Sequence, residues 1–321
     1  MSKPVAVVTG ASRGLGFLLA RELARQGHDL VICARSADGL AAARDDLERA
    51  GAQVHPVTAD LSVREEAEGV VTTAVDHYGR LDVLVNNAGI IQVGPATSMV
   101  PQDFADALGV IFWGAAYPIL TALPVMRRQG GGRIVTITSI GGKLPAPHLL
   151  PYTAAKFAAV GLSEGLRVEL GKHGISVTTA VPGLMRTGSP RNAAFKGDRT
   201  AEHRWFTLGD SIPLLSIDAQ RAARKIVGAA LRGRPEVIVT PAAKVAVRLH
   251  GLAPGLSTRI AAAVDRLLPR TDDSSSPIPG HAVRPSPGWF RALTGLTQSA
   301  ARRYHQYDDN TPPGRQTAHS A

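Results

Sequence analysis

The chain has 321 residues, one cysteine and a formal net charge of +10 at pH 7. One cysteine excludes a disulfide within the chain, and Cys33, in a predicted apolar strand, is expected to be a small buried side chain rather than a nucleophile. Apolar strands alternate with helical patterns over residues 1–240, which predicts one doubly wound α/β domain with a parallel sheet. Residues 2–4 leave no room for a secretory signal before the first strand, so we expect a cytoplasmic protein.

The first predicted strand, at 5–8, leads into a glycine-rich turn at 9–16 and then a helical pattern. Glycines let backbone N–H groups approach a pyrophosphate closely, and the positive end of the following helix favours its charge. An ordinary tight turn is the alternative, since the spacing G-x-x-x-G-x-G differs from the commoner G-x-G-x-x-G. We predict that the turn binds a dinucleotide through Gly10, Ser12, Arg13, Gly14 and Gly16.

Residues 107–126 form a run of twenty residues without a charge, which is long enough to span a membrane. The run lies between a predicted turn at 86–89 and a predicted strand at 133–138, where a parallel sheet requires a helical crossover. Gly114 and Pro118 interrupt it. We therefore predict a crossover helix buried against the sheet rather than a membrane span.

Tyr152 and Lys156 stand four residues apart in a predicted helix, and Ser139 ends an apolar run thirteen residues before the tyrosine. A helix places residues i and i+4 on the same face, so the ammonium can lie beside the phenol. A nearby cation favours the phenolate and so lowers the tyrosine pKa from its usual value of about 10. Such a tyrosine can exchange a proton with a substrate oxygen. The pair alone is a common chance match, but together with Ser139 and the glycine turn it predicts catalysis.

The chain changes character after the last predicted core strand, at 236–239. Residues 241–269 have a helical pattern of apolar and basic residues, which predicts docking on the same core, a partner subunit or an anionic membrane surface. Residues 270–321 are rich in Ser, Pro and Gly and are predicted to be partly disordered, with an aromatic segment at 289–293 that also docks. We find no nucleic-acid-binding motif and expect no nucleic-acid partner. A solvated tail is the alternative to a docked one.

Landmarks between residue 4 and about residue 240 resemble, in the same order, those of the short-chain dehydrogenase/reductase family of the common single-domain type. They are the turn at 9–16, Asp60-Leu61 after a third strand, Asn86-Asn87-Ala88-Gly89 after a fourth, Ser139, the Tyr152 and Lys156 pair, and Pro182-Gly183 with Thr187 after a sixth. The resemblance implies a catalytic triad of Ser139, Tyr152 and Lys156 and a homodimer or homotetramer. It also implies a nicotinamide cofactor whose adenine is fixed at Asp60 and whose carboxamide is held by residues 182–187. Beyond the glycine turn, the cofactor-binding residues that it implies are Asp60, Leu61, Asn87, Ala88, Gly89, Tyr152, Lys156, Pro182, Gly183 and Thr187.

Two arginines indicate which nicotinamide cofactor the chain prefers. Arg13 lies inside the glycine turn, and Arg35 follows the second strand, while Ala34 occupies the position where an NAD-selective protein would have an acid. NADP carries a phosphate on the adenine ribose, which a guanidinium binds well and a carboxylate would repel. We predict NADP(H) as cofactor. The alternative is that both arginines are solvated loop charges.

Ile111 is the main departure from the family pattern, because the family usually has an asparagine there as the fourth member of its catalytic set. In the family that asparagine helps to hold a water that links the lysine to solvent, partly through its backbone carbonyl. Isoleucine keeps only the carbonyl. The proton relay is therefore expected to persist in weaker form or to be lost.

Residues 184–215 and the loop at 141–150 are predicted to cover the substrate. Their apolar side chains suggest a hydrophobic carbonyl or alcohol substrate, although each can equally be ordinary lid packing. Cys/His clusters and H-E-x-x-H are absent from the sequence, so no metal is expected. The predicted function is an oxidoreductase that transfers hydride between NADP(H) and a carbonyl or secondary alcohol, with Tyr152 as acid and base. A nucleotide-sensing binding protein with little turnover is the alternative. The apolar lid residues are Leu184, Met185, Phe195, Trp205, Phe206 and Leu208.

Overall fold

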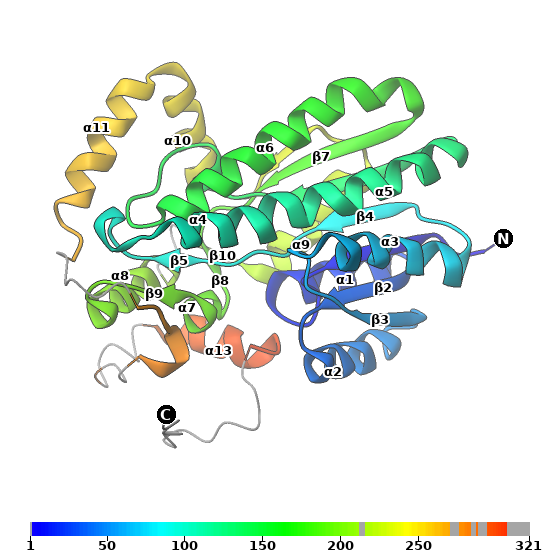
Figure 1. Ribbon diagram of the computed structural model, residues 1–321, viewed down its shortest axis with the longest axis horizontal. Helices are drawn as coiled ribbons and strands as arrows, with labels where there is room; N and C mark the ends of the chain where they lie inside the picture. Colours follow the sequence, from blue (N-terminus) through cyan, green and yellow to red (C-terminus); the bar gives the residue numbers. More distant parts are fainter. Residues whose placement is uncertain (1, 212–215, 270–275, 284–286, 288–293, 307–321) are drawn as a thin grey trace.

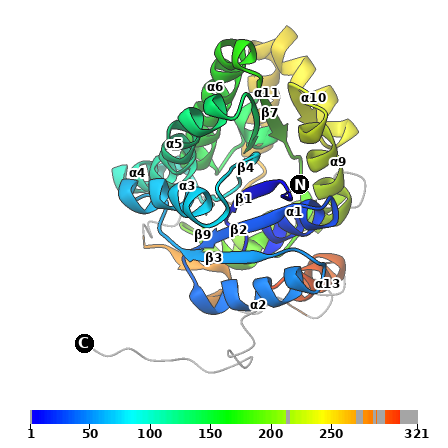
Figure 2. The same ribbon diagram turned by 90° about the vertical axis from the view of Figure 1, so that its right-hand side faces the viewer.

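A computed structural model describes residues 2–211, 216–269, 276–283, 287 and 294–306. Seven parallel strands form one sheet in the order β11-β7-β6-β4-β1-β2-β3, with helices on both faces (Figures 1 and 2). This arrangement confirms the predicted doubly wound α/β fold. The strands are β1 Val5–Thr9, β2 Asp29–Ala34, β3 Val54–Thr58, β4 Val83–Asn86, β6 Gly132–Ile137, β7 Ile175–Val181 and β11 Glu236–Ile238.

The central strands are buried on both faces, which explains why they are almost continuously apolar. Along β1, Ala6 and Val8 pack on one side of the sheet and Val7 packs on the other, because successive side chains alternate. One layer consists of α1 Gly14–Arg25, α2 Ala37–Glu48 and α9 Ala219–Leu231. The opposite layer consists of α3 Arg64–Tyr78, α5 Gly114–Arg128 and α6 Leu150–Leu170. Cys33 is buried in β2, and burial raises the pKa of its thiol to about 12, so the side chain acts as a small hydrophobe.

The apolar run at 107–126 belongs to the crossover between β4 and β6, as predicted. It comprises part of α4 Pro101–Leu108, a π-helical turn η2 Gly109–Trp113 and most of α5. In the described part of the chain, one continuous helix, Pro101–Arg128, is long and apolar enough to cross a membrane, with a mean hydropathy of 1.7. Ile119, Ala122 and Met126 of α5 are fully buried in the core beside the sheet, which accounts for part of this composition.

The region between β7 and α9 is assembled from short elements. They are β8 Met185–Arg186, α7 Ser189–Asn192, β9 Ala194–Phe195 and α8 Arg199–Ser211, followed by β10 Ile217–Asp218, which pairs with β8. Strand β9 pairs in parallel with β5 Gln92–Val93 and antiparallel with β12 Ile278–Pro279. The remaining short turns are η1 Ala96–Ser98, η3 Ile140–Gly142, η4 Gly171–His173 and η5 Gly280–Ala282.

Two helices, α10 Pro241–Leu252 and α11 Pro254–Asp265, follow the sheet and lie at one end of the molecule (Figure 1). They match the helical pattern predicted for 241–269. Most of their large apolar side chains are exposed, whereas Ala243 of α10 is buried. The docking of these helices on another surface stays a prediction. The exposed apolar side chains of the pair and the residues after it are Val245, Leu249, Leu252, Leu256, Ile260, Val264 and Leu267.

The C-terminal range 270–321, for which we expected partial disorder, contributes ordered elements to the described structure. Besides β12, it supplies α13 Gly295–Arg303, which contacts α8 and β8. The aromatic segment at 289–293, most of the Ser/Pro linker and the last dozen residues lie outside the described residues. The described part therefore packs on the catalytic core.

Candidate active site

A cleft of about 430 Å³ opens at the carboxyl ends of β1 to β4. This edge of an open parallel sheet is where nucleotides bind in doubly wound proteins. Predicted residues that line it are Gly10, Ser12, Arg13, Gly14, Gly16, Arg35, Asp60, Leu61, Asn87, Ala88 and Gly89. The predicted residues Tyr152, Lys156, Pro182, Gly183 and Thr187 are not in its lining. Lining residues that we did not predict include Ser36, Ile90, Ile91, Val110, Ser189, Asn192 and Gln306.

The glycine turn requires glycine at particular positions. A Cβ added to Gly16 would lie 2.1 Å from the carbonyl oxygen of Gly10, and Gly10 itself has a φ of +64°. Thr9 and Asn87 tie the turn to the loop after β4. The Asn87 carboxamide donates to the Thr9 and Gly10 carbonyls at 3.0 and 3.2 Å, and Thr9 Oγ1 accepts from the Asn87 N–H at 2.9 Å. These hydrogen bonds hold the glycine turn and the loop after β4 together at the edge of the sheet.

Asp60, after β3, and Arg35, after β2, both line the cleft. The Asp60 carboxylate accepts from the hydroxyl of Ser62 at 2.7 Å and from its backbone N–H at 2.9 Å. These hydrogen bonds, with a contribution from the charge of Arg35, lower the pKa of Asp60, so the carboxylate is ionised at neutral pH. Asp60 therefore shapes a turn and also faces the cleft. Arg35 is exposed at the cleft, where a guanidinium is free to meet an anionic ligand.

The structure brings Ser139, Tyr152 and Lys156 together beside this edge. Ser139 follows β6, and its hydroxyl accepts from the Gly141 N–H at 3.1 Å and hydrogen-bonds the Tyr152 phenol. Tyr152 and Lys156 lie on the first turns of α6, with the Lys156 Nζ 5.6 Å from the Tyr152 ring centroid. The Lys156 ammonium donates to the Ile137 carbonyl at 2.7 Å. The i, i+4 geometry predicted for the pair is therefore present.

The pKa values of the two residues differ from the expected pattern. Burial raises the pKa of Tyr152 to about 12, the Ser139 hydrogen bond opposes this rise, and the negative charge of Asp210 adds to it. Burial lowers the pKa of Lys156 to about 8. The predicted depression of the tyrosine pKa by the ammonium is thus wrong for this structure, because desolvation of the phenolate is the largest effect.

Ile111 is buried close to the Tyr152 and Lys156 pair. It is 3 % exposed, sits in the π-helical turn η2 and packs in a cluster with Ala155 and Tyr152. A Cβ added to Gly89 would lie 3.7 Å from Ile111 Cγ1 and 3.8 Å from the Lys156 Nζ, so both side chains approach the same point. The π-helical turn was not predicted. Such turns are often found at functional sites.

The lid carries polar residues that sequence reasoning missed. Glu202 of α8 is fully buried and accepts from the indole of Trp205 at 2.5 Å, while its other oxygen lies 2.7 Å from His148 Nδ1. His148 Nε2 is 3.5 Å from Asp265 of α11, which ties the loop at 141–150 to two distant helices. Asp210 is buried near Tyr152, and burial raises the pKa of its carboxyl to about 8. A buried acid in a helix of mixed composition has no sequence signature.

Several predicted lid residues serve packing. Phe195 is fully buried and forms a small core with Phe206 and Val93. In the described ranges, no group of three or more His, Cys, Asp or Glu side chains is arranged to hold a metal ion.

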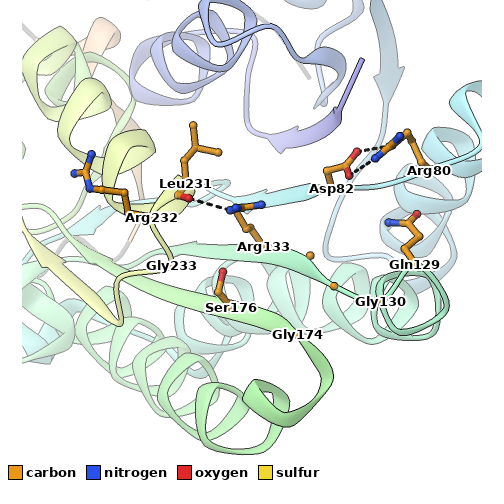
Figure 3. A pocket seen from close by; sticks show the side chains of 12 residues that line it. Arg80, Asp82, Gln129, Gly130, Arg133, Gly174, Ser176, Leu231, Arg232 and Gly233 are labelled. Atoms are coloured by element: carbon orange, nitrogen blue, oxygen red, sulfur yellow. Dashed lines mark hydrogen bonds and ion pairs between the residues drawn. The ribbon is translucent and has the colours of Figure 1, made fainter. Parts of the chain in front are cut away.

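A second cavity, of about 450 Å³, lies at the opposite edge of the sheet, before β4, β6 and β7 (Figure 3). Its charged groups largely satisfy each other. Arg80 forms two hydrogen bonds of 2.8 Å with Asp82, and the Arg133 guanidinium donates to the Leu231 carbonyl at 3.2 Å. The residues with acid–base chemistry therefore gather at the carboxyl edge and not in this cavity.

Comparisons with known proteins agree with this geometry. Residues 4–195 match the family model for short chain dehydrogenases. An 11-beta-hydroxysteroid dehydrogenase of Pinus massoniana is 33% identical over 244 residues, which are 73% of this chain and 66% of that protein. A short-chain dehydrogenase/reductase from Burkholderia phymatum in complex with NAD has a TM-score of 0.73 and 28% identity, covering 79% of this chain and 95% of that one. A variant of actinorhodin polyketide ketoreductase with NADPH has a TM-score of 0.66 and 29% identity, covering 74% and 97%. The chain therefore belongs to the short-chain dehydrogenase/reductase family of oxidoreductases.

Proposed function

We propose that this protein is an NADP(H)-dependent oxidoreductase that interconverts a carbonyl and a secondary alcohol on a hydrophobic substrate. The observation that carries the proposal is the grouping of Ser139, Tyr152 and Lys156 beside a cleft that contains Arg13 and Arg35. Proton-transfer groups and a nucleotide-shaped cleft meet at one edge of the sheet. This combination is what hydride transfer to a carbonyl requires.

A bound nicotinamide ring supplies or accepts the hydride. The Ser139 hydroxyl hydrogen-bonds the substrate oxygen, and the Tyr152 phenol gives a proton to that oxygen during reduction or takes one during oxidation. A pKa of about 12 keeps Tyr152 protonated at neutral pH, so the phenol carries the proton that carbonyl reduction requires. Lys156, fixed by the Ile137 carbonyl, provides a cation that stabilises the phenolate left after the proton is given.

The cofactor side favours NADP(H) through its arginines. Arg35 lines the cleft next to Ala34, so the second strand ends in a cation and carries no acid at this point. One solved neighbour contains NAD and another contains NADPH, so the likeness of fold does not choose between them. The proposed preference for NADP(H) over NAD(H) rests on the positive charges of Arg13 and Arg35 at the cleft. A guanidinium is better suited to the ribose phosphate of NADP than to a free hydroxyl.

Apolar residues at the inner part of the cleft support a hydrophobic substrate. Ile90, Ile91 and Val110 line it, and Leu149 and Trp205 pack on the small lid core beside it. The names of the relatives point to ketone and hydroxysteroid chemistry for those proteins. Residues 182–187, which follow β7, are the segment that we propose to hold the carboxamide of the cofactor.

A substrate screen tests the proposal. Purified protein is mixed with NADPH and a set of aldehydes and ketones, or with NADP and secondary alcohols, and absorbance of the reduced cofactor is followed. The Tyr152→Phe protein, prepared in parallel, identifies activity from contaminants. We expect turnover with apolar ketones in the native protein alone. Tight NADPH binding with no turnover across the screen would instead favour the nucleotide-sensing alternative.

A further inference from the structure

The C-terminal segment 294–306 returns to the cofactor cleft after a long excursion along the chain. Figure 2 shows α13 next to α2, and His305 Nε2 lies 2.7 Å from an Asp46 carboxylate oxygen of that helix. The His305 ring also packs edge-on against Phe17 of α1, with a distance of 4.7 Å between the ring centroids. Tyr304 is 3 % exposed and belongs to the main hydrophobic core. The segment is therefore seated on the layer that carries the glycine turn.

Two glycines, Gly14 in the glycine turn and Gly188 after β8, receive the end of this segment. The Gly14 N–H donates to the Tyr304 carbonyl at 2.8 Å, and the Gly188 N–H donates to Oε1 of Gln306. A Cβ added to Gly14 would lie 2.9 Å from the Gln306 Nε2, and one added to Gly188 would lie 2.7 Å from the Gln306 Oε1. The Gln306 side chain thus fits between the two loops because both positions are glycine.

Gln306 is 8 % exposed and lines the cleft. Because its Oε1 is held by Gly188, its NH₂ group is the end of the carboxamide on the glycine-turn side, and an NH₂ group carries two donors. The cleft keeps a volume of about 430 Å³ with the segment in place, so the segment forms a wall and does not fill the space. The family match ends at residue 195, far before this segment.

We propose that Gln306 is a cofactor-binding residue and that its carboxamide N–H donates to the pyrophosphate of the dinucleotide. Phosphate oxygens are acceptors, and Gln306 adds a side-chain donor next to the backbone N–H groups of the turn. The inference rests on the proposed function, because it requires a dinucleotide in this cleft. It makes the C-terminal segment a third wall of the site, beside the glycine turn and the loop after β7.

Direct binding measurements on the full-length protein test the proposal. We expect Gln306→Ala to weaken NADPH binding by about 10- to 100-fold, the range for a lost hydrogen bond to a charged group, in a fluorescence titration. Affinity for ADP-ribose, which has the pyrophosphate and no nicotinamide, should fall by the same factor. Gln306→Glu keeps the shape and the acceptor for Gly188 but replaces the donor by a negative charge, so it should weaken binding at least as much.

Gln298→Ala is the matched control. It removes the same group from α13, where Gln298 bonds Thr294 at 3.0 Å and does not line the cleft, so NADPH affinity should not change. Melting temperatures without cofactor identify a variant that is misfolded, and Gln306→Glu then decides the question alone. Unchanged affinity in folded Gln306 variants would overturn the inference and leave the proposed function intact. Tighter binding would overturn it too, because the segment would then compete with the cofactor. A native protein that binds neither NADPH nor NADH would overturn both.

Discussion

The two sides of the active-site cleft differ in how the chain builds them. The cofactor side consists mainly of loops that follow β1 to β4 in succession, which the parallel sheet brings to one edge, and Gln306 joins them from the C-terminal segment. The substrate side is assembled from segments far apart in sequence, where the loop at 141–150 meets α8 and α11 through His148. Local sequence and topology therefore fix most of the first side, whereas the second depends on long-range contacts that a change in any one segment can alter.

A buried ion pair joins the lid to the crossover helix. Lys196 follows β9, and its ammonium lies 2.7 Å from the carboxylate of Asp103 in α4, with both side chains almost fully buried. The same carboxylate accepts from the Val100 N–H at 2.8 Å. Removing one partner of such a pair leaves an uncompensated charge, so the pair constrains how the lid can rearrange.

Replacement of Tyr152 by phenylalanine should have the largest effect, because it lowers turnover without disturbing cofactor binding. The change removes the proton-donating hydroxyl and leaves the glycine turn untouched. Turnover on a validated substrate should fall by about 10²- to 10⁴-fold, while NADPH affinity changes little. Lys156→Ala should lower both quantities. Steady-state rates and fluorescence titrations measure them. Retention of more than a few per cent of activity by the Phe variant would show that Tyr152 is not the acid and base.

Arg35→Asp should act on the cofactor side alone. It replaces a cation in the cleft by an anion, so we expect NADPH affinity to fall by about 10- to 100-fold and NADH affinity to change much less. Titrations at moderate salt compare the two cofactors. Arg128→Asp, at the exposed end of α5, makes the same change in net charge and should leave both affinities unchanged. Equal affinities of the native protein for NADPH and NADH would show that Arg35 does not select NADP(H).

The cofactor side was predictable because its signals are local. The apolar strand at 5–8 and the spacing of Gly10, Gly14 and Gly16 specify a strand, a turn and a helix before any long-range contact is known. The i, i+4 pair of Tyr152 and Lys156 likewise needs only a helix. Sheet topology then determines which loops meet. These positions lie in the structure at the edge where the sequence places them.

The substrate side was not predictable in the same way. Strands β5, β9 and β12 have two residues each, which is too short for any periodic pattern, and their pairings join Gln92 to Ala194 and Ile278 to Phe195, far apart along the chain. Asp210 matters through its burial, which a single sequence does not reveal. On the cofactor side, Gln306 escaped prediction for the same reason. The tyrosine pKa was predicted in the wrong direction for the same reason, because desolvation depends on the surrounding packing.

Asp210→Asn probes the substrate side through pH. Burial raises the pKa of Asp210 from 3.8 to about 8. Between these values the folded state binds more protons than the unfolded state, so the carboxyl makes the protein less stable as pH rises. We expect the Asn variant to gain a few degrees in melting temperature relative to the native protein between about pH 5 and pH 7.5. Both pH values lie below the pKa of about 8 to which burial lowers Lys156, so this lysine stays mostly protonated in the comparison.

Asp76→Asn, the same substitution at an exposed position of α3, provides the control for this comparison. A constant gap between the Asp210 variant and the native protein at the two pH values would mean that the carboxyl is ionised throughout. In that case Asp210 would be a permanent negative charge beside Tyr152 rather than a neutral acid.

Ile111→Asn has the smallest expected effect on activity, and it tests whether the proton relay needs a side chain at position 111. If the backbone carbonyl alone supports the proton relay, the added amide is not needed and turnover should be unchanged or slightly raised. The amide would replace a side chain that is 3 % exposed and packs on Tyr152, and burial of an amide without partners costs about 1 to 3 kcal/mol. Ile111→Val, which keeps the site apolar, should preserve both stability and rate. Thermal unfolding measures the change in stability, and steady-state rates measure the change in turnover. A folded but inactive Asn variant would show that position 111 acts through its packing on Tyr152 and not as the site of a missing relay group.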